Sequence, residues 1–80
     1  WYGQEIARNY DLNKLGSLVI KSTTSQPRKG NPAPRACETS AGWLNAYGLN
    51  NAGVDNVVQE KLPWLAQNYP ELPVIASAAG

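Results

Sequence analysis

The chain has 80 residues, of which 42% are hydrophobic and 16% are charged, with seven lysines and arginines against six aspartates and glutamates. That length allows at most one small domain, and the formal net charge of +1 excludes a dominant basic field for nucleic acid. A single cysteine and the absence of histidine exclude a disulfide framework, a zinc cluster and a histidine-based catalytic triad within these residues.

The start of the chain predicts a short helix followed by a buried strand. Ile6 and Tyr10 lie four residues apart and share an apolar stripe, which favours a short helix within residues 1–15. The aliphatic run at residues 18–20 predicts a strand over residues 17–22. Because the run does not alternate with polar residues, we expect this strand to be covered on both faces, as in a parallel sheet.

A long loop and a hairpin are predicted next. Residues that break regular structure recur over positions 23–35, namely Pro27, Gly30, Pro32 and Pro34. A loop of this length in a compact domain is usually functional or disordered. Residues 35–48 are predicted to form short extended pieces that turn at residues 40–42.

The clearest helical pattern lies between residues 54 and 68. Apolar residues repeat there at three- and four-residue spacing: Val54, Val57, Val58, Leu62 and Leu65. Pro63 removes one backbone hydrogen bond, so a kink is expected. Residues 73–77 predict a second buried strand, and the strand–helix–strand order implies parallel strands with a right-handed crossover. Two strands cannot bury both faces of a parallel sheet, so we expect these residues to belong to a larger fold.

Polar residues suited to ligand binding follow the first strand and the predicted hairpin. Lys21 and Ser22 stand at the carboxyl end of the strand, where parallel α/β folds collect ligands. Asn45 precedes Gly48, whose unusual backbone angles can aim successive N–H groups at a carboxylate. The spacing alone favours a plainer interpretation, in which Lys21 is solvated and the Asn and Gly residues only form turns.

The loop cations and the single thiol are predicted to have structural roles. Arg28, Lys29 and Arg35 lie together, but the Walker spacing and the dinucleotide glycine pattern are absent. We expect Arg28 and Arg35 to brace the loop by pairing with Glu38 or with backbone carbonyls. No histidine is present to activate Cys37, so a buried, inert thiol is predicted.

Six segments, taken in order, give the chain a resemblance to a known family. They are GSLVIKSTT at 16–24, PRKGNPAPR at 27–35, ET at 38–39, GWLNAYGL at 42–49, NAGVD at 51–55 and LPWL at 62–65. Together they resemble the N-terminal third of class 1 dihydroorotate dehydrogenases, flavin enzymes of pyrimidine (UMP) biosynthesis, and most closely the NAD-linked catalytic-subunit type. The resemblance implies an α/β fold in which residues 1–80 form about the first third of a (βα)8 TIM barrel with FMN at its C-terminal mouth.

The resemblance also implies which residues contact the ligands. Three residues are implied to contact FMN: Lys21, Ser22 and Ser77. Six are implied to contact the substrate, the last four mainly through their backbone: Lys21, Asn45, Ala46, Tyr47, Gly48 and Leu49. The family's catalytic base, a cysteine or serine on a later loop, would lie beyond Gly80. We therefore expect no catalytic residue within these 80, Cys37 included, and no activity from the fragment alone.

The chain departs from the family pattern at three positions. Ser77 stands where many relatives have asparagine, and its hydroxyl can still bond to a flavin oxygen. Tyr47 replaces a smaller aliphatic residue, and Trp43 stands where methionine is common. Trp43 and Trp64 are predicted to be packing residues because of their large apolar surface.

The implied reaction is the oxidation of dihydroorotate to orotate. A base removes a proton from C5 while a hydride passes from C6 to the flavin. Lys21 would stabilise the negative charge that develops near flavin and substrate. In the NAD-linked type, electrons leave through a partner subunit that carries FAD and a 2Fe-2S cluster, and the full chain is expected to form a homodimer.

Two other functions remain open. A dihydropyrimidine dehydrogenase-like flavin barrel would act on uracil or thymine, whereas a non-catalytic small α/β module would fold cooperatively by itself. No nucleic acid or membrane is expected as a partner, because no apolar run approaches the ~20 residues of a bilayer span. One unpaired cysteine is typical of a reducing compartment and favours the cytoplasm. The absence of methionine predicts a processed product or an excised piece.

Overall fold

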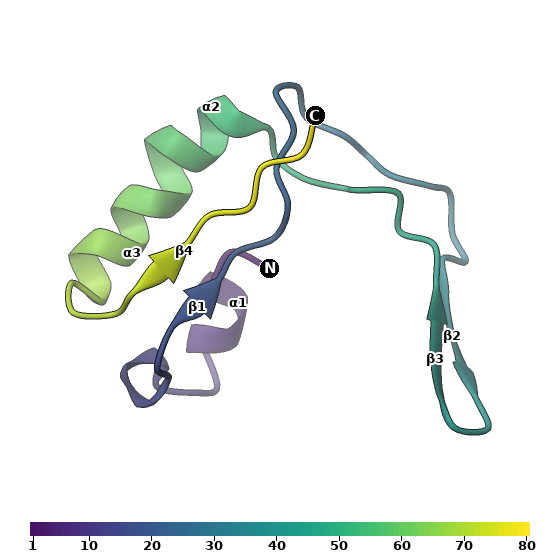
Figure 1. The fold of residues 1–80 in the computed structure, drawn as a ribbon, viewed down its shortest axis with the longest axis horizontal. Coiled ribbons are helices and arrows are strands. Elements are labelled where there is room, and N and C mark those ends of the chain that lie inside the picture. The colour runs from purple at the N-terminus through teal and green to yellow at the C-terminus, as the bar shows by residue number, and fades with distance from the viewer.

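The computed structural model describes residues 1–80 and contains a strand–helix–strand unit and a separate hairpin (Figure 1). Strand β1 (Leu18–Val19) pairs in parallel with β4 (Val74–Ile75), with Leu18 opposite Val74 and Val19 opposite Ile75. The predicted parallel pairing is therefore confirmed. Before β1 lie the helix α1 (Gln4–Ala7) and a 3-10 turn (Leu12–Lys14). None of the helices combines the length and the hydrophobicity that a membrane-spanning segment requires.

Backbone pairing continues beyond the ends of these two short strands. The Ile20 N–H donates to the Ile75 carbonyl at 3.0 Å, and the Thr23 N–H donates to the Ser77 carbonyl at 2.9 Å. Thr23 also forms a parallel bridge with Ala78. The two chain segments thus run together as far as residue 79, which brings Ser22 beside Ser77 at the carboxyl end of the pair.

One continuous helical stretch connects the hairpin to β4. It consists of α2 (Val54–Asn56), a π-helical turn (Val57–Lys61) and α3 (Leu62–Asn68). In the π turn, the Leu62 N–H donates to the Val57 carbonyl five residues earlier. Pro63 occupies the first turn of α3, directly after the π turn, and it has no N–H to donate within the helix. The hydrogen-bond pattern thus changes from π to α directly before Pro63, and the expected kink there stays a prediction.

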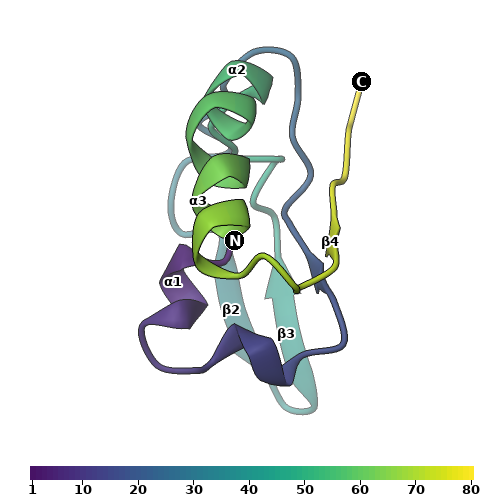
Figure 2. The ribbon, with the colours of Figure 1, turned by 90° about the vertical axis from the view of Figure 1, so that its left-hand side faces the viewer.

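The hydrophobic core lies on only one side of the β1–β4 pair. Its buried members are Tyr2, Leu12, Leu18, Ile20, Val57, Leu65 and Leu72. Trp64 packs against this core, as predicted, whereas Val19 is 60% exposed and Ile75 is 53% exposed. The prediction of a strand covered on both faces is wrong within these residues, because a single helical layer can cover only one face of the sheet (Figure 2).

The predicted hairpin is confirmed, and it projects away from the rest of the chain (Figure 1). Strand β2 (Ala36–Thr39) pairs antiparallel with β3 (Gly42–Asn45), and every residue of both strands is exposed. Two predictions are therefore wrong. Cys37 is exposed rather than buried, and Trp43 is 72% exposed rather than packed. The physical reason is that neither face of the two-stranded hairpin meets another layer within these 80 residues.

A buried asparagine ties the two long connections of the chain together. The Asn51 Oδ1 atom accepts from the N–H groups of Thr24 at 3.2 Å and Gly53 at 2.9 Å. Its Nδ2 donates to the Leu49 carbonyl at 2.8 Å and to Thr24 Oγ1 at 3.0 Å. The Asn51 backbone also pairs in both directions with Arg28. Both ends of the amide are thus satisfied by partners 2 and 27 residues away.

Replacing Asn51 with alanine is expected to destabilise the full-length protein that carries this segment by about 2 kcal/mol, because it leaves buried N–H and carbonyl groups unpaired. The thermal unfolding midpoint measures this loss. Asn13→Ala is the matched control, since the Asn13 side chain is exposed and makes no hydrogen bond. Equal midpoints for the two variants would show that the Asn51 bonds contribute nothing.

Candidate functional site

All the predicted site residues except Ser77 line one open cleft between the end of β1 and the chain that leaves β3. The cleft has a volume of about 430 Å³. Its lining consists of Lys21, Ser22, Asn45, Ala46, Tyr47, Gly48, Leu49 and Asn50. Residues more than twenty positions apart in sequence therefore meet at the carboxyl end of a parallel strand, which is where α/β folds place their ligand sites.

The carbonyl groups of residues 46–49 are all occupied by the neighbouring loop or by Asn51. The Nδ2 and backbone N of Asn31 donate to the Ala46 and Tyr47 carbonyls, at 2.7 and 2.9 Å. The Arg28 guanidinium donates to the Gly48 carbonyl through two nitrogens, each at 3.3 Å. The Leu49 carbonyl accepts from Asn51. The acceptor side of this segment is thus held against the protein.

The donor side of the same segment is free. The Ala46 N–H donates to the Arg35 carbonyl, but the four N–H groups of residues 47–50 donate to no acceptor in the chain. Gly48 has a φ of 78° and Leu49 a φ of 58°, so two successive residues adopt the left-handed conformation. A turn that exposes consecutive N–H groups has the donors that an anion requires.

Leu49 carries strain that Gly48 does not. A leucine with positive φ is uncommon, because its Cβ crowds the backbone, and the conformation lasts only where the surroundings fix it. Here the Asn51 amide holds the Leu49 carbonyl, and Arg28 holds the carbonyl of Gly48. The loop therefore enforces the backbone shape that leaves the donors free.

Lys21 lies across the cleft from these donors. Its side chain is half-buried, and its backbone N–H donates to the Trp1 carbonyl at 2.9 Å. Its ammonium lies 5.8 Å from the centre of the Tyr2 ring, within the range of a cation–π contact. Neither wall of the cleft carries a carboxylate that would neutralise Lys21. An ammonium, an amide side chain and free backbone N–H groups make the cleft suitable for an electron-rich or anionic ligand.

Ser22 and Ser77 meet at the end of the paired strands. Their hydroxyl oxygens are 2.8 Å apart and share one hydrogen bond. Ser22 lines the cleft, whereas Ser77 does not line it and is bonded to the Ser22 hydroxyl. The structure thus brings Ser77 next to Ser22 without placing it in the cleft lining.

The loop cations brace the cleft. Besides the Arg28 bonds to Gly48, Arg35 Nη1 donates to the carbonyls of Lys29 and Asn31, at 3.1 and 3.3 Å. Arg35 also stacks over the Tyr47 ring at 5.6 Å. The expected pairing with backbone carbonyls is confirmed, whereas the alternative partner Glu38 forms no bond with either arginine.

Sequence reasoning missed three residues that shape the cleft, namely Gly30, Asn31 and Asn51. Gly30 has a φ of 77°, and a Cβ there would lie 2.2 Å from the Tyr47 carbonyl oxygen. The sequence shows these residues only as glycine and asparagine in loops. Because both residue types are common in ordinary turns, they do not by themselves indicate a role in a binding site.

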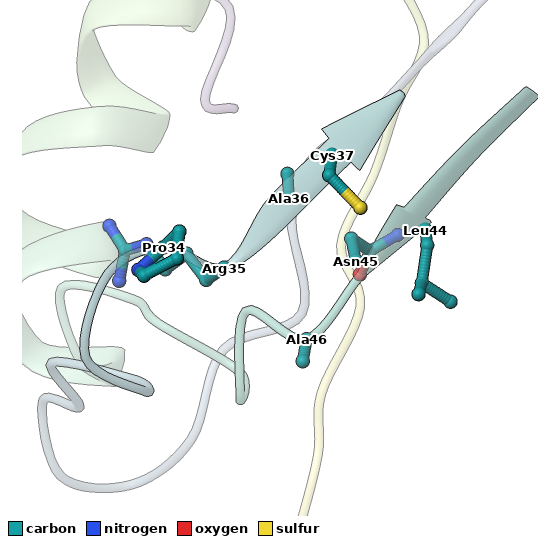
Figure 3. A pocket seen from close by; sticks show the side chains of 7 residues that line it. All are labelled: Pro34, Arg35, Ala36, Cys37, Leu44, Asn45 and Ala46. Atoms are coloured by element: carbon teal, nitrogen blue, oxygen red, sulfur yellow. The ribbon is translucent and has the colours of Figure 1, made fainter. Parts of the chain in front are cut away.

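A second hollow of about 300 Å³ lies along the hairpin (Figure 3). It is lined by Pro34, Arg35, Ala36, Cys37, Leu44, Asn45 and Ala46. Asn45 lines both hollows, and Cys37 is the register partner of Leu44 on the facing strand. In Figure 3 the Arg35 guanidinium points away from the hairpin, toward the loop that it braces. The exposed thiol of Cys37 therefore lies next to the candidate site but outside its cleft.

Comparison with known proteins shows to which family this chain belongs. The family model described as dihydroorotate dehydrogenase matches residues 2–80. The chain belongs to the dihydroorotate dehydrogenase family. The implied resemblance is thereby confirmed over nearly every residue.

Relatives of two kinds match this dihydroorotate dehydrogenase segment. It is 68% identical to "Dihydroorotate dehydrogenase A (fumarate)" of Limosilactobacillus reuteri over 99% of the chain and 26% of that protein. It is 61% identical to "Dihydroorotate dehydrogenase B (NAD(+)), catalytic subunit" of Streptococcus pneumoniae over 99% of the chain and 25% of that protein. The NAD-linked protein of Latilactobacillus sakei is 56% identical. The chain thus spans about a quarter of the length of these relatives, somewhat less than the expected third.

Proposed function

We propose that the full-length protein carrying this segment oxidises dihydroorotate to orotate, with FMN as the hydride acceptor, in pyrimidine biosynthesis. One observation carries the proposal: Lys21, Asn45 and a run of free backbone N–H groups line one cleft at the carboxyl end of a parallel strand. Residues 1–80 would form part of a (βα)8 barrel. The exposed Val19 and Ile75 support this assignment, because further strands and helices of a barrel would cover them.

The donor set of the cleft fits the electron-rich edge of a flavin. Lys21 and Ser22 offer an ammonium and a hydroxyl at the cleft wall, and Ser77 fixes the Ser22 hydroxyl from behind. We assign these three residues to FMN, with Ser77 acting through Ser22. FMN, when bound, supplies a two-electron acceptor, and the protein's part is to orient its ring and to stabilise added negative charge.

The opposite wall fits a small carboxylated ring. The free N–H groups of Tyr47, Gly48 and Leu49 can donate to a carboxylate, which accepts several hydrogen bonds. Asn45 presents both a donor and an acceptor and can pair with the amide edge of a pyrimidine ring. Lys21 would contact the substrate as well as the flavin. No carboxylate, histidine or thiol lines the cleft, and the Ser22 hydroxyl is bonded to Ser77, so we assign the proton-abstracting base to a residue outside this segment.

The substrate carboxylate distinguishes the proposed function from the competing dihydropyrimidine dehydrogenase-like function, because dihydroorotate carries a carboxylate and dihydrouracil does not. The full-length protein is expected to reduce its flavin with dihydroorotate and to show no flavin reduction with dihydrouracil, because uracil rings leave the free amides of residues 47–49 unpaired. Stopped-flow absorbance of the flavin measures both reactions. Faster reduction by dihydrouracil than by dihydroorotate would overturn the assignment.

For the electron acceptor, we propose the NAD-linked arrangement, with a homodimer of the full chain in the cytoplasm and a partner subunit that carries FAD and a 2Fe-2S cluster. The support is the 61% identity to an NAD(+)-type catalytic subunit. The 68% identity to a fumarate-type protein favours a second candidate, in which the full chain passes electrons to fumarate without a partner.

These two arrangements predict opposite results for the purified full-length chain. If the NAD-linked arrangement is right, the chain alone reduces fumarate slowly. Adding the electron-transfer subunit of an NAD-type relative then increases the rate of NAD(+) reduction by at least about tenfold. Both rates are read from orotate formation. Rapid turnover with fumarate and no stimulation by the partner would establish the fumarate-linked function instead.

A further inference from the structure

Tyr2 is a buried residue that lies next to Lys21 of the candidate cleft and is bonded to the chain just after its other wall. It is 7% exposed, and the hydroxyl oxygen accepts a hydrogen bond from the Ala52 N–H at 3.0 Å. Its own N–H donates to the Glu5 carboxylate at 3.3 Å. The ring is thus fixed at one end by α1 and at the other end by the chain that follows the free donors of residues 47–50.

Two ammonium groups lie near the Tyr2 ring. Lys21 Nζ is 5.8 Å and Lys61 Nζ is 5.5 Å from the ring centre. Lys61 is also held by the Gln4 side-chain oxygen at 3.3 Å. Lys21, in contrast, makes no side-chain hydrogen bond in the chain, so the ring is the one group here that attracts its ammonium. The negative face of an aromatic ring attracts a cation, and more strongly where water is partly excluded.

The backbone places Tyr2 beside Lys21 as well. The Lys21 N–H donates to the carbonyl of Trp1, the residue before Tyr2, at 2.9 Å. A flexible four-carbon side chain loses conformational entropy when its ammonium is fixed beside a ligand. A ring that already holds the ammonium near that position reduces the entropy lost when the ligand binds. Tyr2 is well placed to do this, because its own position is set by hydrogen bonds to two neighbours, Glu5 and Ala52.

We propose that Tyr2 is a positioning residue, which holds the Lys21 ammonium at the edge of the cleft through the face of its ring. The proposal rests on the function proposed above for Lys21. The tyrosine hydroxyl has a separate role, because it fixes the distance between the ring and the Ala52 backbone. Removing the ring and removing the hydroxyl should therefore have different consequences.

A double-mutant cycle in the full-length, FMN-loaded protein tests the proposal. Tyr2→Leu is expected to slow flavin reduction by dihydroorotate about fivefold when residue 21 is lysine, the loss equivalent to one cation–π contact. In the Lys21→Met background, Tyr2→Leu is expected to change the rate by less than about twofold, because the partner of the ring is already gone. A merely structural role for Tyr2 would produce the same loss in both backgrounds and would overturn the proposal.

Ring substitution tests the electrostatic part without removing packing. Tyr2→Phe keeps the ring, and replacement of Tyr2 by 3,4,5-trifluorophenylalanine keeps its shape but weakens the negative face. The fluorinated variant is expected to reduce flavin more slowly than Tyr2→Phe and to bind orotate more weakly, as measured by the absorbance change of bound FMN. Equal rates and equal dissociation constants for these two variants would contradict the proposal, even if Tyr2→Leu fails to fold.

A similar contact elsewhere in the chain provides the control. Lys14 Nζ lies 5.8 Å from the ring of Tyr10, which is exposed and does not line the cleft. Tyr10→Leu is expected to leave flavin reduction unchanged. The Lys21→Met arm separates the two levels of inference: if it leaves the rate unchanged, the proposed function of Lys21 fails. If it lowers the rate while Tyr2→Leu does not, only the positioning role fails.

Discussion

Replacing Lys21 with methionine in the full-length protein is expected to lower kcat by roughly 10²-fold while FMN remains bound. Methionine keeps an unbranched apolar side chain, so packing at the end of β1 changes little. What is lost is the only cation that lines the cleft. A fixed charge that stabilises negative charge in the transition state typically contributes about 10²- to 10³-fold to kcat.

The measurement is the single-turnover rate of flavin reduction by dihydroorotate, together with the FMN content of the purified variant. Lys29→Met is the matched control, since Lys29 is exposed on the neighbouring loop and does not line the cleft. A Lys21→Met protein that keeps its FMN and reduces it at the wild-type rate would remove Lys21 from the site.

Replacing Gly30 with alanine is expected to destabilise the protein by at least about 2 kcal/mol and to abolish orotate binding. Alanine in the left-handed conformation costs about 1–2 kcal/mol by itself. Its Cβ would also lie 2.2 Å from the Tyr47 carbonyl oxygen, so this backbone must move. The movement would break the bond between the Asn31 N–H and that carbonyl, which helps to hold the free donors toward the cleft.

Two measurements separate the consequences of the Gly30 change. The unfolding midpoint reports the strain, and titration with orotate, read from flavin absorbance, reports the shape of the donor segment. Gly42→Ala is the control, because a Cβ at Gly42 meets no atom within 4 Å. If Gly30→Ala binds orotate as tightly as Gly42→Ala does, the segment of residues 46–49 does not form the carboxylate site.

The elements that the sequence predicted correctly are those with a strong local pattern. The spacing of Val57, Leu62 and Leu65 identified the helix, and the aliphatic run at residues 18–20 identified the first strand. The turn residues at 40–42 identified the hairpin. These patterns depend on residues that are only a few positions apart, so they can be recognised directly in the sequence.

Exposure was predicted less well, because burial depends on which layers are present. Val19, Cys37 and Trp43 were expected to be covered and are exposed. Each lies on a sheet face against which no other part of these 80 residues packs. An apolar side chain indicates that burial would be favourable, but it does not specify which segment supplies the covering surface.

The sequence predicted the residues that line the site but not the residues that hold the lining segment in place. The sequence predicts Lys21, Asn45 and residues 46–49 as site residues, and they line one cleft. It does not predict Asn31 and Asn51, although their side chains hold the carbonyls that turn the donors outward. Their partners lie up to 27 residues away, and nothing in a loop asparagine indicates which distant carbonyl it will bond.

The most direct test of the account is a crystal structure of the full-length protein, loaded with FMN and bound to orotate. We expect the orotate carboxylate to lie within hydrogen-bond distance of the N–H groups of residues 47–49, and the Lys21 ammonium to contact the same ligand or the flavin ring. An orotate molecule bound outside this cleft, with Lys21 directed into solvent, would contradict it.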